Sequence, residues 1–564
     1  MMVSDRSIRP FISSELRDIP GDAFPRLTSE MLIGMHGFGC HEDFDGGEYL
    51  YRVGDRGVDL FFVLEGSVDI LENDGRGGHG LVATHEAGEF TGELDHLSGR
   101  AVLFCAKANV PTKVLRVSHE RFRQLVSAQP EIGDIILRAL ILRRARLLAF
   151  SEGGTVVVGS CRSGDTLRIQ TFLERNGYPY RCLDTDDDVD AQEALDTFHV
   201  DAASLPIVIV NGIDVLPKPS NRQLAESLGI AEHLNPAQVH DVVVVGAGPS
   251  GLAAAVYAAS EGLDTMVIEA IGPGGQAGTS SRIENYLGFP MGISGQDLAR
   301  RAQIQAQKFG ARFIVAEAAW RLDCTCDPFA LHLDGGSLVL ARSVVVATGA
   351  RYRRLAIPGA QSFEGRGIHY AATPIEANLC AESEVVVVGG GNSAGQAAVF
   401  LSGVARHVHL LVRGEGLADT MSDYLVRRID QSSRITLHTR SEITSLDGEE
   451  YLSRVRWRSH GSADVEREIS NLFLMIGAVP NTDWLDGCLE LDKTGFVKTG
   501  FQHDGWSRGT SYATSVPGIF AVGDVRADSV KRVASGVGEG SVVVQSVHRW
   551  LASAKEPSAQ AAAE

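Results

Sequence analysis

The pattern of apolar and polar positions changes character twice along the chain, near residue 150 and near residue 240. Between residues 21 and 118, short alternating runs such as Asp59–Leu64 and Thr112–Val117 are separated by glycine turns. Alternation with a period of two is typical of strands that bury one face, so this block predicts a β-roll or barrel. From His119 to Phe150 apolar residues recur at helical spacing, which predicts helices that complete a domain at residues 21–150.

Arginines gather on the other side of this helical pattern, at Arg138, Arg143, Arg144 and Arg146. A helix that is apolar on one side and basic on the other ordinarily turns its charged side to water. We therefore predict that these guanidinium groups form a solvated face.

Residues 155–232 predict a small α/β unit, because short apolar runs alternate there with amphipathic stretches. The predicted strands are Thr155–Gly159, Tyr180–Leu183 and Ile207–Val210, and the predicted helices begin at Asp165 and cover Ala191–Phe198. The order indicates a compact unit separate from the block that precedes it.

A strand followed by a glycine-rich turn occurs twice between residues 240 and 552, and the first turn, at residues 241–251, has the pattern GxGxxG. Gly246 permits the tight turn, Gly248 lets a pyrophosphate approach the helix N-terminus, and Gly251 lets the helix pack close to the sheet. Glu269 ends the next strand, 23 residues after Gly246, where an acid binds a ribose. This pattern predicts a dinucleotide site in a Rossmann-like domain.

The second turn, at residues 384–394, has the pattern GxGxxA but lacks the acid after its second strand. The matching position holds Val412, followed by Arg413. An apolar plus a basic residue favours a 2′-phosphate over a free 2′-hydroxyl, so NADPH is predicted in preference to NADH, with NADH still possible. The residues predicted to bind it are Gly389, Gly391, Asn392, Ser393, Ala394 and Arg413.

Length and charge limit the remaining possibilities. The 564 residues predict about three to five domains at roughly 100–200 residues each. The 71 acidic against 52 basic residues give a net charge of −19, which argues against nucleic acid or a membrane as the main partner. Residues 1–20 form an arm without a signal-peptide core, so we expect a cytoplasmic protein, and residues 553–564 are predicted to be a disordered tail.

The eight cysteines are scattered, and the closest pair is Cys324 and Cys326. This spacing indicates neither a disulfide framework nor a zinc-ligand pattern, and no metal site is expected. We predict that these two cysteines act as small apolar residues rather than as redox groups.

Several motifs after residue 240 resemble those of low-molecular-weight thioredoxin reductases, which are flavoproteins of the pyridine-nucleotide disulfide oxidoreductase family. The motifs are Gly274–Thr279, Ile283–Pro290, Ala347–Ala350, Gly477–Thr482 and Gly518–Asp524. The resemblance implies an α/β fold with two Rossmann-like domains. One would be an FAD-binding domain split between residues 240–355 and 480–552, and the other an NAD(P)H-binding domain at 356–479. It also implies a homodimer.

The same resemblance implies how FAD is held. In the family, the position that matches Asp524 binds the ribityl chain of FAD, and those that match Gln276 and Asn285 lie beside the flavin. The full set of predicted FAD-binding residues is Gly246, Gly248, Gly251, Glu269, Gly275, Gln276, Asn285, Thr348, Gly349, Gly523 and Asp524.

The redox-active CxxC of thioredoxin reductases is missing from this chain. In the segment that begins at Gly365, Ala371 and Pro374 stand where the two sulfur atoms would be. The usual electron route from flavin to thioredoxin is therefore absent. Cys380 lies six residues beyond Pro374 and is predicted to be a small buried residue rather than a redox group.

Residues 155–232 resemble a thioredoxin-like, specifically glutaredoxin-like, domain. Pro206 matches the family's cis-proline, and Cys161 matches the first active cysteine, but no second cysteine follows it. Cys161 would lie near a helix N-terminus, where the helix dipole lowers a thiol pKa. Either a monothiol relay or a docking domain is possible, and we favour docking.

Residues 21–150 resemble a cyclic-nucleotide-binding domain through the segment Gly88–Leu94 and the pair Arg100 and Ala101. The resemblance implies that Gly92 and the amides after it hold the cyclic phosphate, Glu93 the ribose 2′-hydroxyl and Arg100 the phosphate, with Leu94 and Ala101 beside them. Cyclic AMP or cyclic GMP is the implied ligand. The loop before Arg100 is shorter than usual, so a pocket that no longer binds nucleotide is the open alternative.

Together these features predict an FAD-dependent NAD(P)H oxidoreductase that resembles thioredoxin reductase but passes electrons to an unidentified acceptor. A cyclic nucleotide would gate it. Cys161 is the weak candidate for a catalytic residue on the chain itself. Two alternatives stay open: a ferredoxin or flavodoxin type of NADP reductase, and a non-catalytic sensor that responds to flavin state and cyclic nucleotide.

Overall fold

The computed structural model describes residues 22–73, 79–92, 99–150, 154–211, 214–232, 234–461, 463–485, 487–503 and 511–553. The predicted arm at residues 1–20 and residues 554–564 of the predicted tail lie outside these ranges, as do Glu93 and Leu94. The chain forms two compact units. The first holds Met1–Ser160, Asn176–Glu232 and Gln307–Phe309, and the second holds Cys161–Arg175, His233–Ala306 and Gly310–Glu564.

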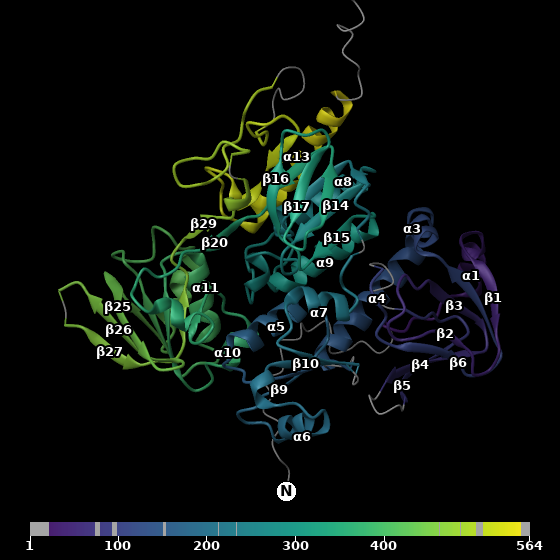
Figure 1. The fold of residues 1–564 in the computed structure, drawn as a ribbon, viewed down its shortest axis with the longest axis horizontal. Helices are drawn as coiled ribbons and strands as arrows, with labels where there is room; N and C mark the ends of the chain where they lie inside the picture. The colour runs from purple at the N-terminus through teal and green to yellow at the C-terminus, as the bar shows by residue number, and fades with distance from the viewer. Residues whose placement is uncertain are drawn as a thin grey trace, which may run out of the picture. The chain divides into compact units, whose positions relative to one another are not determined.

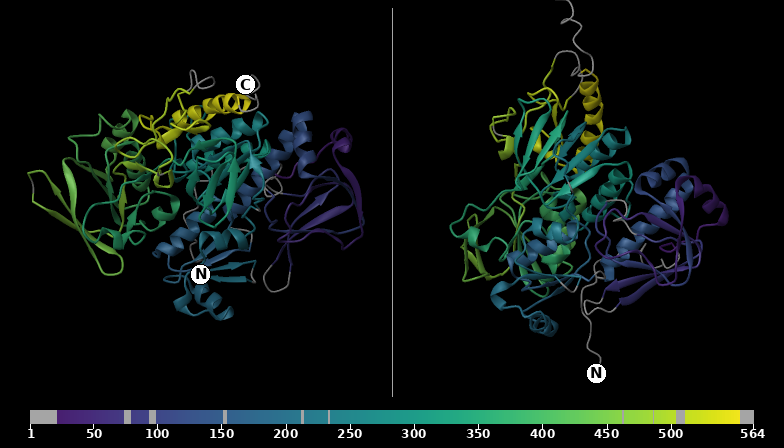
Figure 2. Two further views of the ribbon diagram at one scale, coloured as in Figure 1. Left: turned by 45° about the horizontal axis from the view of Figure 1, so that its top comes forward. Right: turned by 45° about the vertical axis from the view of Figure 1, so that its right-hand side comes forward.

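Residues 22–150 of the first unit form a β-roll followed by two helices, as the alternating pattern predicted (purple to blue in Figures 1 and 2). The strand orders are β1–β7–β3 in one sheet and β2–β6–β4–β5 in the other. Phe62, Phe90 and Leu115 are fully buried between the elements. The elements are α1 (Ser29–Met35), η2 (His36–Phe38), β1 (Cys40–Phe44), β2 (Tyr49–Tyr51), β3 (Leu60–Glu65), β4 (Ser67–Asn73), β5 (His79–Glu86), β6 (Cys105–Ala108), β7 (Thr112–Val117), α3 (His119–Ala128) and α4 (Pro130–Phe150).

The prediction that the arginines of α4 form a solvated face is wrong for two of them, because Arg143 and Arg144 are only 7% and 3% exposed. The Nε of Arg143 donates to the carbonyl of Ala23, and its Nη1 donates to those of Phe90 and Gly92, at 2.8, 3.0 and 2.9 Å. The guanidinium also lies 4.6 Å from the centre of the Phe90 ring. These carbonyls and this ring replace water, so the charge is stabilised under the helix.

The rest of the first unit contains a four-stranded sheet with the order β11–β10–β8–β9, in which only β8 and β9 are parallel. Its elements are β8 (Val156–Val158), β9 (Arg181–Leu183), α6 (Val189–Thr197), η3 (Ala202–Ser204), β10 (Ile207–Val210), β11 (Asp214–Pro217) and α7 (Asn221–Ser227). The peptide bond before Pro206 is cis, as predicted. Helix α5 (Gly164–Arg175) follows β8 in sequence but belongs to the second unit.

The second unit is built around two parallel sheets, and the first has the order β15–β14–β13–β19–β30. Helix α8 packs against it, and α13 packs beside α8 (Figures 1 and 2). Strands β13 and β19 consist of valine alone, and β14 is apolar between its two end residues, as expected of strands covered on both faces. The elements are β13 (Val242–Val245), α8 (Pro249–Ser260), β14 (Thr265–Glu269), η4 (Ala277–Thr279), α9 (Gly295–Lys308), β15 (Arg312–Val315), β19 (Val344–Val346), β30 (Ile519–Ala521), η7 (Gly523–Val525) and α13 (Val533–Ser553).

The second parallel sheet has the order β21–β28–β22–β23–β24. In the sequence its strands lie between β20 (Ala350–Tyr352) and β29 (Ala478–Pro480), which pair antiparallel with each other. The chain therefore leaves the first sheet and returns to it through adjacent strands. The elements of this part are η5 (Ala360–Phe363), β21 (Ile368–His369), α10 (Pro374–Asn378), β22 (Glu384–Val388), α11 (Asn392–Leu401), β23 (His407–Leu411), α12 (Asp423–Gln431), β24 (Ile435–His438) and β28 (Leu472–Leu474).

Two further sheets complete the second unit: a mixed one, in which β12 and β18 pair parallel, and an antiparallel one. One has the order β12–β18–β17–β16 and the other β25–β26–β27. Their strands and the short helix after β29 are β12 (Val239–His240), β16 (Ala319–Asp323), β17 (Phe329–Leu333), β18 (Leu338–Ala341), β25 (Ser441–Gly448), β26 (Leu452–Ser459), β27 (Val465–Glu468) and η6 (Asp483–Leu485). Within the described ranges, no helix is both long and apolar enough to span a bilayer.

Candidate dinucleotide and regulatory sites

The first glycine turn joins β13 to α8 at the carboxyl edge of the sheet. Gly246 has a φ of +103°, and a Cβ there would overlap the carbonyl of Ala347, while a Cβ at Gly251 would overlap the carbonyl of Gly246. Gly248 is the N-cap of α8 without a side-chain cap, and a Cβ there would come no closer than 3.9 Å to Gly275. The turn is therefore closed on its inner side and open at the helix N-terminus, which fits a pyrophosphate.

Glu269 lies beside this turn, where the sequence predicted a ribose-binding acid. Its Oε2 accepts a hydrogen bond from the amide of Ala247 at 2.8 Å, and its Oε1 accepts from the amide of Ile271 at 3.1 Å. Each carboxylate oxygen keeps a further lone pair, so the side chain can still accept from a ribose hydroxyl.

Thr348 and Gly349 follow β19 at the same edge, and Asn481 holds them. Thr348 Oγ1 donates to the Asn481 carbonyl at 2.8 Å, and Asn481 Nδ2 donates to the Thr348 carbonyl at 2.9 Å. The Asn481 amide donates to the Gly349 carbonyl at 3.1 Å. We call these three hydrogen bonds the Asn481 clamp. Sequence reasoning did not assign this role to Asn481, although it lies within the motif Gly477–Thr482.

Gly523 and Asp524 follow β30, the neighbour of β19, so the structure brings them to this edge as well. The Gly523 amide donates to Glu539 Oε2 at 2.6 Å, and the other oxygen of Glu539 pairs with Arg526 at 2.8 Å. Burial raises the pKa of Asp524, and the charge of Lys531 opposes that shift. No sequence signal pointed to Glu539, because it is an isolated acid in a helix of small residues.

The two residues predicted beside the flavin differ in their surroundings. The Gln276 side chain donates to the Ala350 carbonyl, which places it at the start of β20. Asn285 is exposed, and the residue before it, Glu284, pairs with Arg428 at 2.5 Å. Only Gln276 is thus tied to the strand that leads out of the first sheet.

The second glycine turn joins β22 to α11. Gly389 has a φ of +144°, and a Cβ there would overlap the carbonyl of Met475. Gly391 is the N-cap of α11 without a side-chain cap, and a Cβ there would come no closer than 4.0 Å to Thr420. Ala394 is fully buried. This turn is also open at the helix N-terminus and fits a second pyrophosphate.

Two side chains of the second turn form hydrogen bonds with residues outside it. Asn392 Oδ1 accepts from the amide of Ser422 at 2.7 Å. Ser393 forms a hydrogen bond with the hydroxyl of Tyr352 in β20, and burial raises the pKa of that phenol. Tyr352 therefore links the second turn to the strand that carries the chain between the two sheets.

Arg413 follows β23 and is exposed, and no ion-pair partner for it occurs among the residues the structure describes. Glu415, two residues on, pairs instead with Arg440 at 2.6 Å. The two other arginines in the region are engaged, Arg427 by Asp423 at 2.9 Å and Arg428 by Glu284.

The segment at the missing CxxC begins a helix instead. Pro374 is the first residue of α10, and Thr373 caps this helix in a capping box with Glu376. Ala372 forms a parallel bridge with Ser280. Cys380 is fully buried, and burial raises the pKa of its thiol to about 12. Its predicted role as a small buried residue agrees with this burial.

Helix α5, which follows Cys161, lies against this segment. A Cβ on Gly164 would come within 3.4 Å of the Gly365 carbonyl. At the other end of α5, Gln296 Nε2 donates to the carbonyls of Glu174 and Arg175 at 3.4 and 3.1 Å. Cys161 itself is half-buried, three residues before Gly164.

Arg175 brings a positive charge to the end of α5. Burial lowers the pKa of its guanidinium, and the carboxylates of Glu269 and Glu376 oppose that shift. The sequence did not point to Arg175, because contact between α5 and residues more than 90 positions later follows only from folding.

The β-roll contains a pocket lined mostly by apolar side chains. The lining residues are Phe24, Tyr51, Ile70, Val82, Ala83, His85, Gly92, Val102, Phe104, Arg143, Arg146 and Leu147. Of the predicted nucleotide-binding residues described by the structure, only Gly92 is among them. Arg100 instead donates to the carbonyl of Asn176 at 2.9 Å, and the amide of Ala101 donates to the carbonyl of Gly229 at 3.3 Å.

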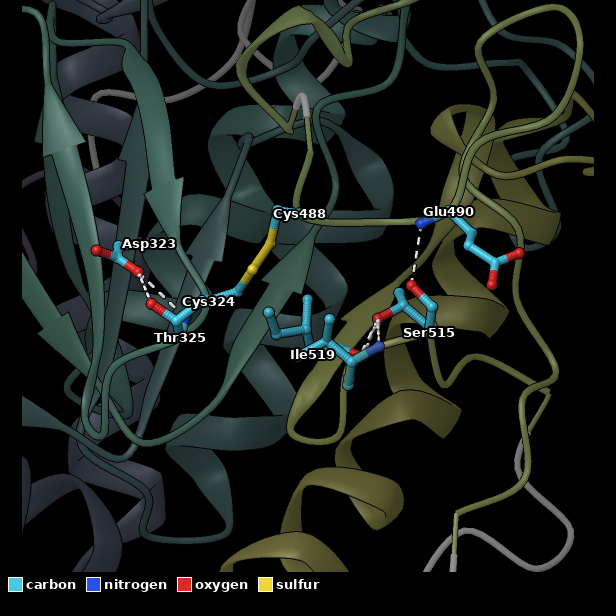
Figure 3. The surroundings of a disulfide bond; sticks show 9 residues. Asp323, Cys324, Thr325, Cys488, Glu490, Ser515 and Ile519 are labelled. Atoms are coloured by element: carbon cyan, nitrogen blue, oxygen red, sulfur yellow. Dashed lines mark hydrogen bonds between the residues drawn. A yellow bond between two sulfur atoms is a disulfide. The ribbon is translucent and has the colours of Figure 1, made fainter.

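The expectation that Cys324 acts only as a small apolar residue is wrong, because Cys324 forms a disulfide with Cys488 (Figure 3). The two residues are 164 positions apart, so no local spacing could reveal the bond. Cys326 stays a free, exposed cysteine. Among the described residues, no group of three or more His, Cys, Asp or Glu side chains is arranged to hold a metal ion.

Comparison with known proteins agrees with this geometry. The family model for pyridine nucleotide-disulphide oxidoreductases matches residues 240–540, and that for cyclic nucleotide-binding domains matches residues 41–129. The chain belongs to the pyridine nucleotide-disulphide oxidoreductase family. Membership in this family implies FAD and a nicotinamide dinucleotide as cofactors.

Several relatives within the family are thioredoxin reductases. The chain is 35% identical over 328 residues to NADPH-dependent thioredoxin reductase 3 of Arabidopsis thaliana, covering 56% of this chain but only 59% of the plant protein. It is 33% identical over 316 residues to the thioredoxin reductase of Mycolicibacterium smegmatis, covering 56% of this chain and 97% of that enzyme. The solved thioredoxin reductase of Lactococcus lactis superposes with a TM-score of 0.51 at 25% identity, covering 56% of this chain and 99% of that enzyme. The chain is thus a thioredoxin reductase-like oxidoreductase of this family.

Proposed function

We propose that this oxidoreductase carries FAD at the first glycine turn, takes electrons from NADPH at the second, and delivers them to an acceptor other than a CxxC disulfide of its own. The observation that carries the proposal is the contrast between two open dinucleotide turns and a sulfur-free position at Ala371 and Pro374. Pro374 starts a capped helix, so this segment is committed to a structural role.

The groups that would hold FAD come from three strand ends of one sheet. The turn at Gly248 would face the pyrophosphate, Glu269 would accept from the ribose, and Asp524 would face the ribityl chain. When bound, FAD supplies a group that accepts a hydride and passes electrons on in pairs or singly. Glu539 keeps the Asp524 loop in place by binding the Gly523 amide.

NADPH is proposed in preference to NADH because Arg413 is the exposed cation that follows the second strand. The carboxylate nearest in sequence, Glu415, is engaged by Arg440 and does not neutralise it. A guanidinium in this place pairs with a 2′-phosphate, whereas a carboxylate would bind a 2′-hydroxyl.

The function is tested by anaerobic addition of NADPH, and separately NADH, to the purified protein while the flavin absorbance is followed. Bleaching with NADPH at a lower concentration than with NADH is the expected result. Reoxidation is then measured with ferredoxin, flavodoxin, a quinone and thioredoxin, and thioredoxin should be the poorest acceptor. Bound FAD that neither nucleotide reduces would contradict the proposal and favour a flavin sensor.

An internal acceptor is tested with Cys161→Ser. If Cys161 accepts electrons, this variant loses a thiol-dependent part of the turnover that the matched variant Cys182→Ser keeps; both cysteines are half-buried. If α5 only docks against α10, both variants retain the turnover of the parent protein. We propose the docking role, because α5 is held at both ends by backbone contacts within the second unit.

We further propose that the β-roll binds a cyclic nucleotide, cyclic AMP or cyclic GMP, and thereby regulates the reductase. The match of residues 41–129 to the cyclic nucleotide-binding family and the pocket at Gly92 support this proposal. Arg143 brings a buried cation to the pocket, and a cation can pair with a cyclic phosphate. Calorimetric titration with each cyclic nucleotide tests binding, and NADPH-dependent flavin reduction with and without nucleotide tests regulation.

A further inference from the structure

The disulfide between Cys324 and Cys488 lies outside the proposed path of electrons from NADPH to FAD. Cys324 directly follows β16, and Cys488 lies three residues after η6. Both cysteines pack against the apolar core of the first parallel sheet and are half-buried. Figure 3 shows the bond between these two segments.

The other side of the bond lines a hollow of about 400 Å³. Trp320 and Trp484 form its aromatic part, and Asp323 and Asp483 form its acidic part. Trp320 is 56% exposed, so the hollow opens to solvent. A thiol-bearing molecule can therefore approach the sulfur atoms of Cys324 and Cys488. The thiols of Cys105 and Cys380, by contrast, are buried.

A third sulfur lies nearby but is poorly suited to attack the disulfide. Cys326 is exposed, and its hydrogen bond with Asp323 raises the pKa of its thiol. Because the thiolate is the nucleophile in disulfide exchange, a raised pKa disfavours attack by Cys326 at neutral pH. The hollow that opens to solvent at the disulfide instead favours an attacking thiol from outside the chain.

A series of hydrogen bonds within residues 481–488 connects the disulfide to the Asn481 clamp. Trp484 Nε1 donates to the Asn481 carbonyl at 3.2 Å, and the Leu485 amide donates to the Thr482 carbonyl at 2.9 Å. The Cys488 amide then donates to the Leu485 carbonyl at 3.0 Å. The segment from Asn481 to Cys488 is therefore fixed at one end by Thr348 and Gly349 and at the other by the disulfide.

We propose that Cys324–Cys488 is a redox-active disulfide that a small thiol reduces through the hollow, and that its opening loosens the Asn481 clamp. A thiolate attacks one sulfur, a mixed disulfide forms, and the other cysteine leaves as a thiolate that takes a proton from water. A second thiol resolves the mixed disulfide. In sum, two thiols become one disulfide, and the protein gains two thiols. The effect on the clamp rests on the proposed FAD site, whereas the exchange itself does not.

The exchange is tested by counting alkylated cysteines by mass in the full-length protein. Unfolding without reductant should label six cysteines, those other than Cys324 and Cys488, and reduction should raise this to all eight. Glutathione at millimolar concentration, added to the folded holoprotein before alkylation, should expose Cys324 and Cys488. Eight labelled cysteines before any reduction, or labelling of this pair only after unfolding, would overturn the proposal.

The effect on the clamp is tested by the rate of FAD release. Cys324→Ser and Cys488→Ser should each release FAD roughly fivefold faster or more, the lower end of typical coupling between sites, and the control Cys326→Ser should match the parent protein. Oxidised and glutathione-reduced parent protein give the same comparison on one polypeptide if a variant folds poorly. Equal release rates would overturn the clamp coupling. A flavin that NADPH cannot reduce would contradict the proposed function and leave the thiol count unchanged.

Discussion

The two glycine turns of the second unit have the same pattern but different surroundings. At the first turn, Gly251 leaves no room for a Cβ beneath the Gly246 carbonyl, whereas at the second turn the matching residue, Ala394, is accommodated. The first turn also has Gly275 and the Asp524 loop beside it, and an acid at the end of the next strand. Both N-caps are open, and the second turn has an exposed arginine near it. The more enclosed surroundings of the first turn suit a cofactor that stays bound, and the simpler surroundings of the second suit a nucleotide that exchanges.

The largest expected effect comes from adding one methyl group to the first turn. Gly251→Ala would force the Cβ into the Gly246 carbonyl, so the strand and helix must separate; overpacking of this kind costs roughly 1–3 kcal/mol or more. We expect loss of bound FAD and a lower thermal midpoint. The flavin-to-protein absorbance ratio and a melting curve measure the two effects.

The matched control is Gly248→Ala, whose Cβ would meet nothing closer than 3.9 Å. Its methyl group would instead enter the space proposed for the pyrophosphate. The FAD content should fall while the thermal midpoint of the FAD-free protein stays unchanged. If both variants kept their FAD, the first turn would not be the FAD site.

At the second turn, Gly391→Ala should change nucleotide use without changing FAD content. The added Cβ would meet nothing closer than 4.0 Å in the protein, but it would stand at the open helix N-terminus. We expect the KM for NADPH to rise roughly tenfold, as for the loss of about 1.4 kcal/mol of binding. Stopped-flow reduction of the flavin measures this. Unchanged KM with lowered FAD content would reverse the assignment of the two turns.

The sequence predicted the fold well at positions where the local backbone conformation requires a particular residue type. The glycines of both turns, the apolar strands that precede them and Pro206 all specify local backbone, and each lies where the pattern indicated. The predicted domain boundaries and cofactor contacts remain predictions. The difference lies in sequence separation. A glycine turn is determined by a few neighbouring residues, whereas the cofactor contacts require the ends of three strands to come together.

Residues whose role depends on distant partners were not predictable. Arg143 was expected in water because its helix is basic, but carbonyls from more than 50 positions earlier surround it. Cys324 and Cys488 are 164 residues apart, and Asn481 meets Thr348 across 133 positions. Local periodicity contains no information on such pairs, since they form only when β29 returns beside β20.

A smaller effect is expected from the charge near the second turn than from the space at either turn. Arg413→Gln should raise the KM for NADPH roughly fivefold and leave the KM for NADH unchanged, because one guanidinium–phosphate pair is lost. Arg427→Gln is the control, since Arg427 is already paired with Asp423. The ratio of kcat/KM for the two nucleotides is the readout. A parallel change for NADPH and NADH would argue against 2′-phosphate recognition by Arg413.

The smallest expected effect is on stability in mild acid and again distinguishes the two parallel sheets. In the second sheet, burial lowers the pKa of His438 to about 4, and the neighbouring His409 adds to this shift. The unfolded chain binds a proton near pH 6.5, so between that pH and about 4 it holds more protons than the folded chain. Stability therefore falls as pH falls through this range.

Directly before β14 of the first sheet, the hydrogen bond with His240 lowers the pKa of Asp264 to about 2. The stability that this shift contributes is present above about pH 4 and is lost only below it. Lowering the pH from about 7.5 to about 5.5 should therefore act through His438, together with His85, His369 and His409, whose pKa burial also lowers, and leave Asp264 ionised. Because His438 is partly exposed, we expect a cost of at most about 1 kcal/mol, a few degrees in the thermal midpoint. His438→Asn should remove part of this acid-induced shift, whereas Asp264→Asn should lower the midpoint equally at both pH values; the reverse result would assign the acid sensitivity to Asp264.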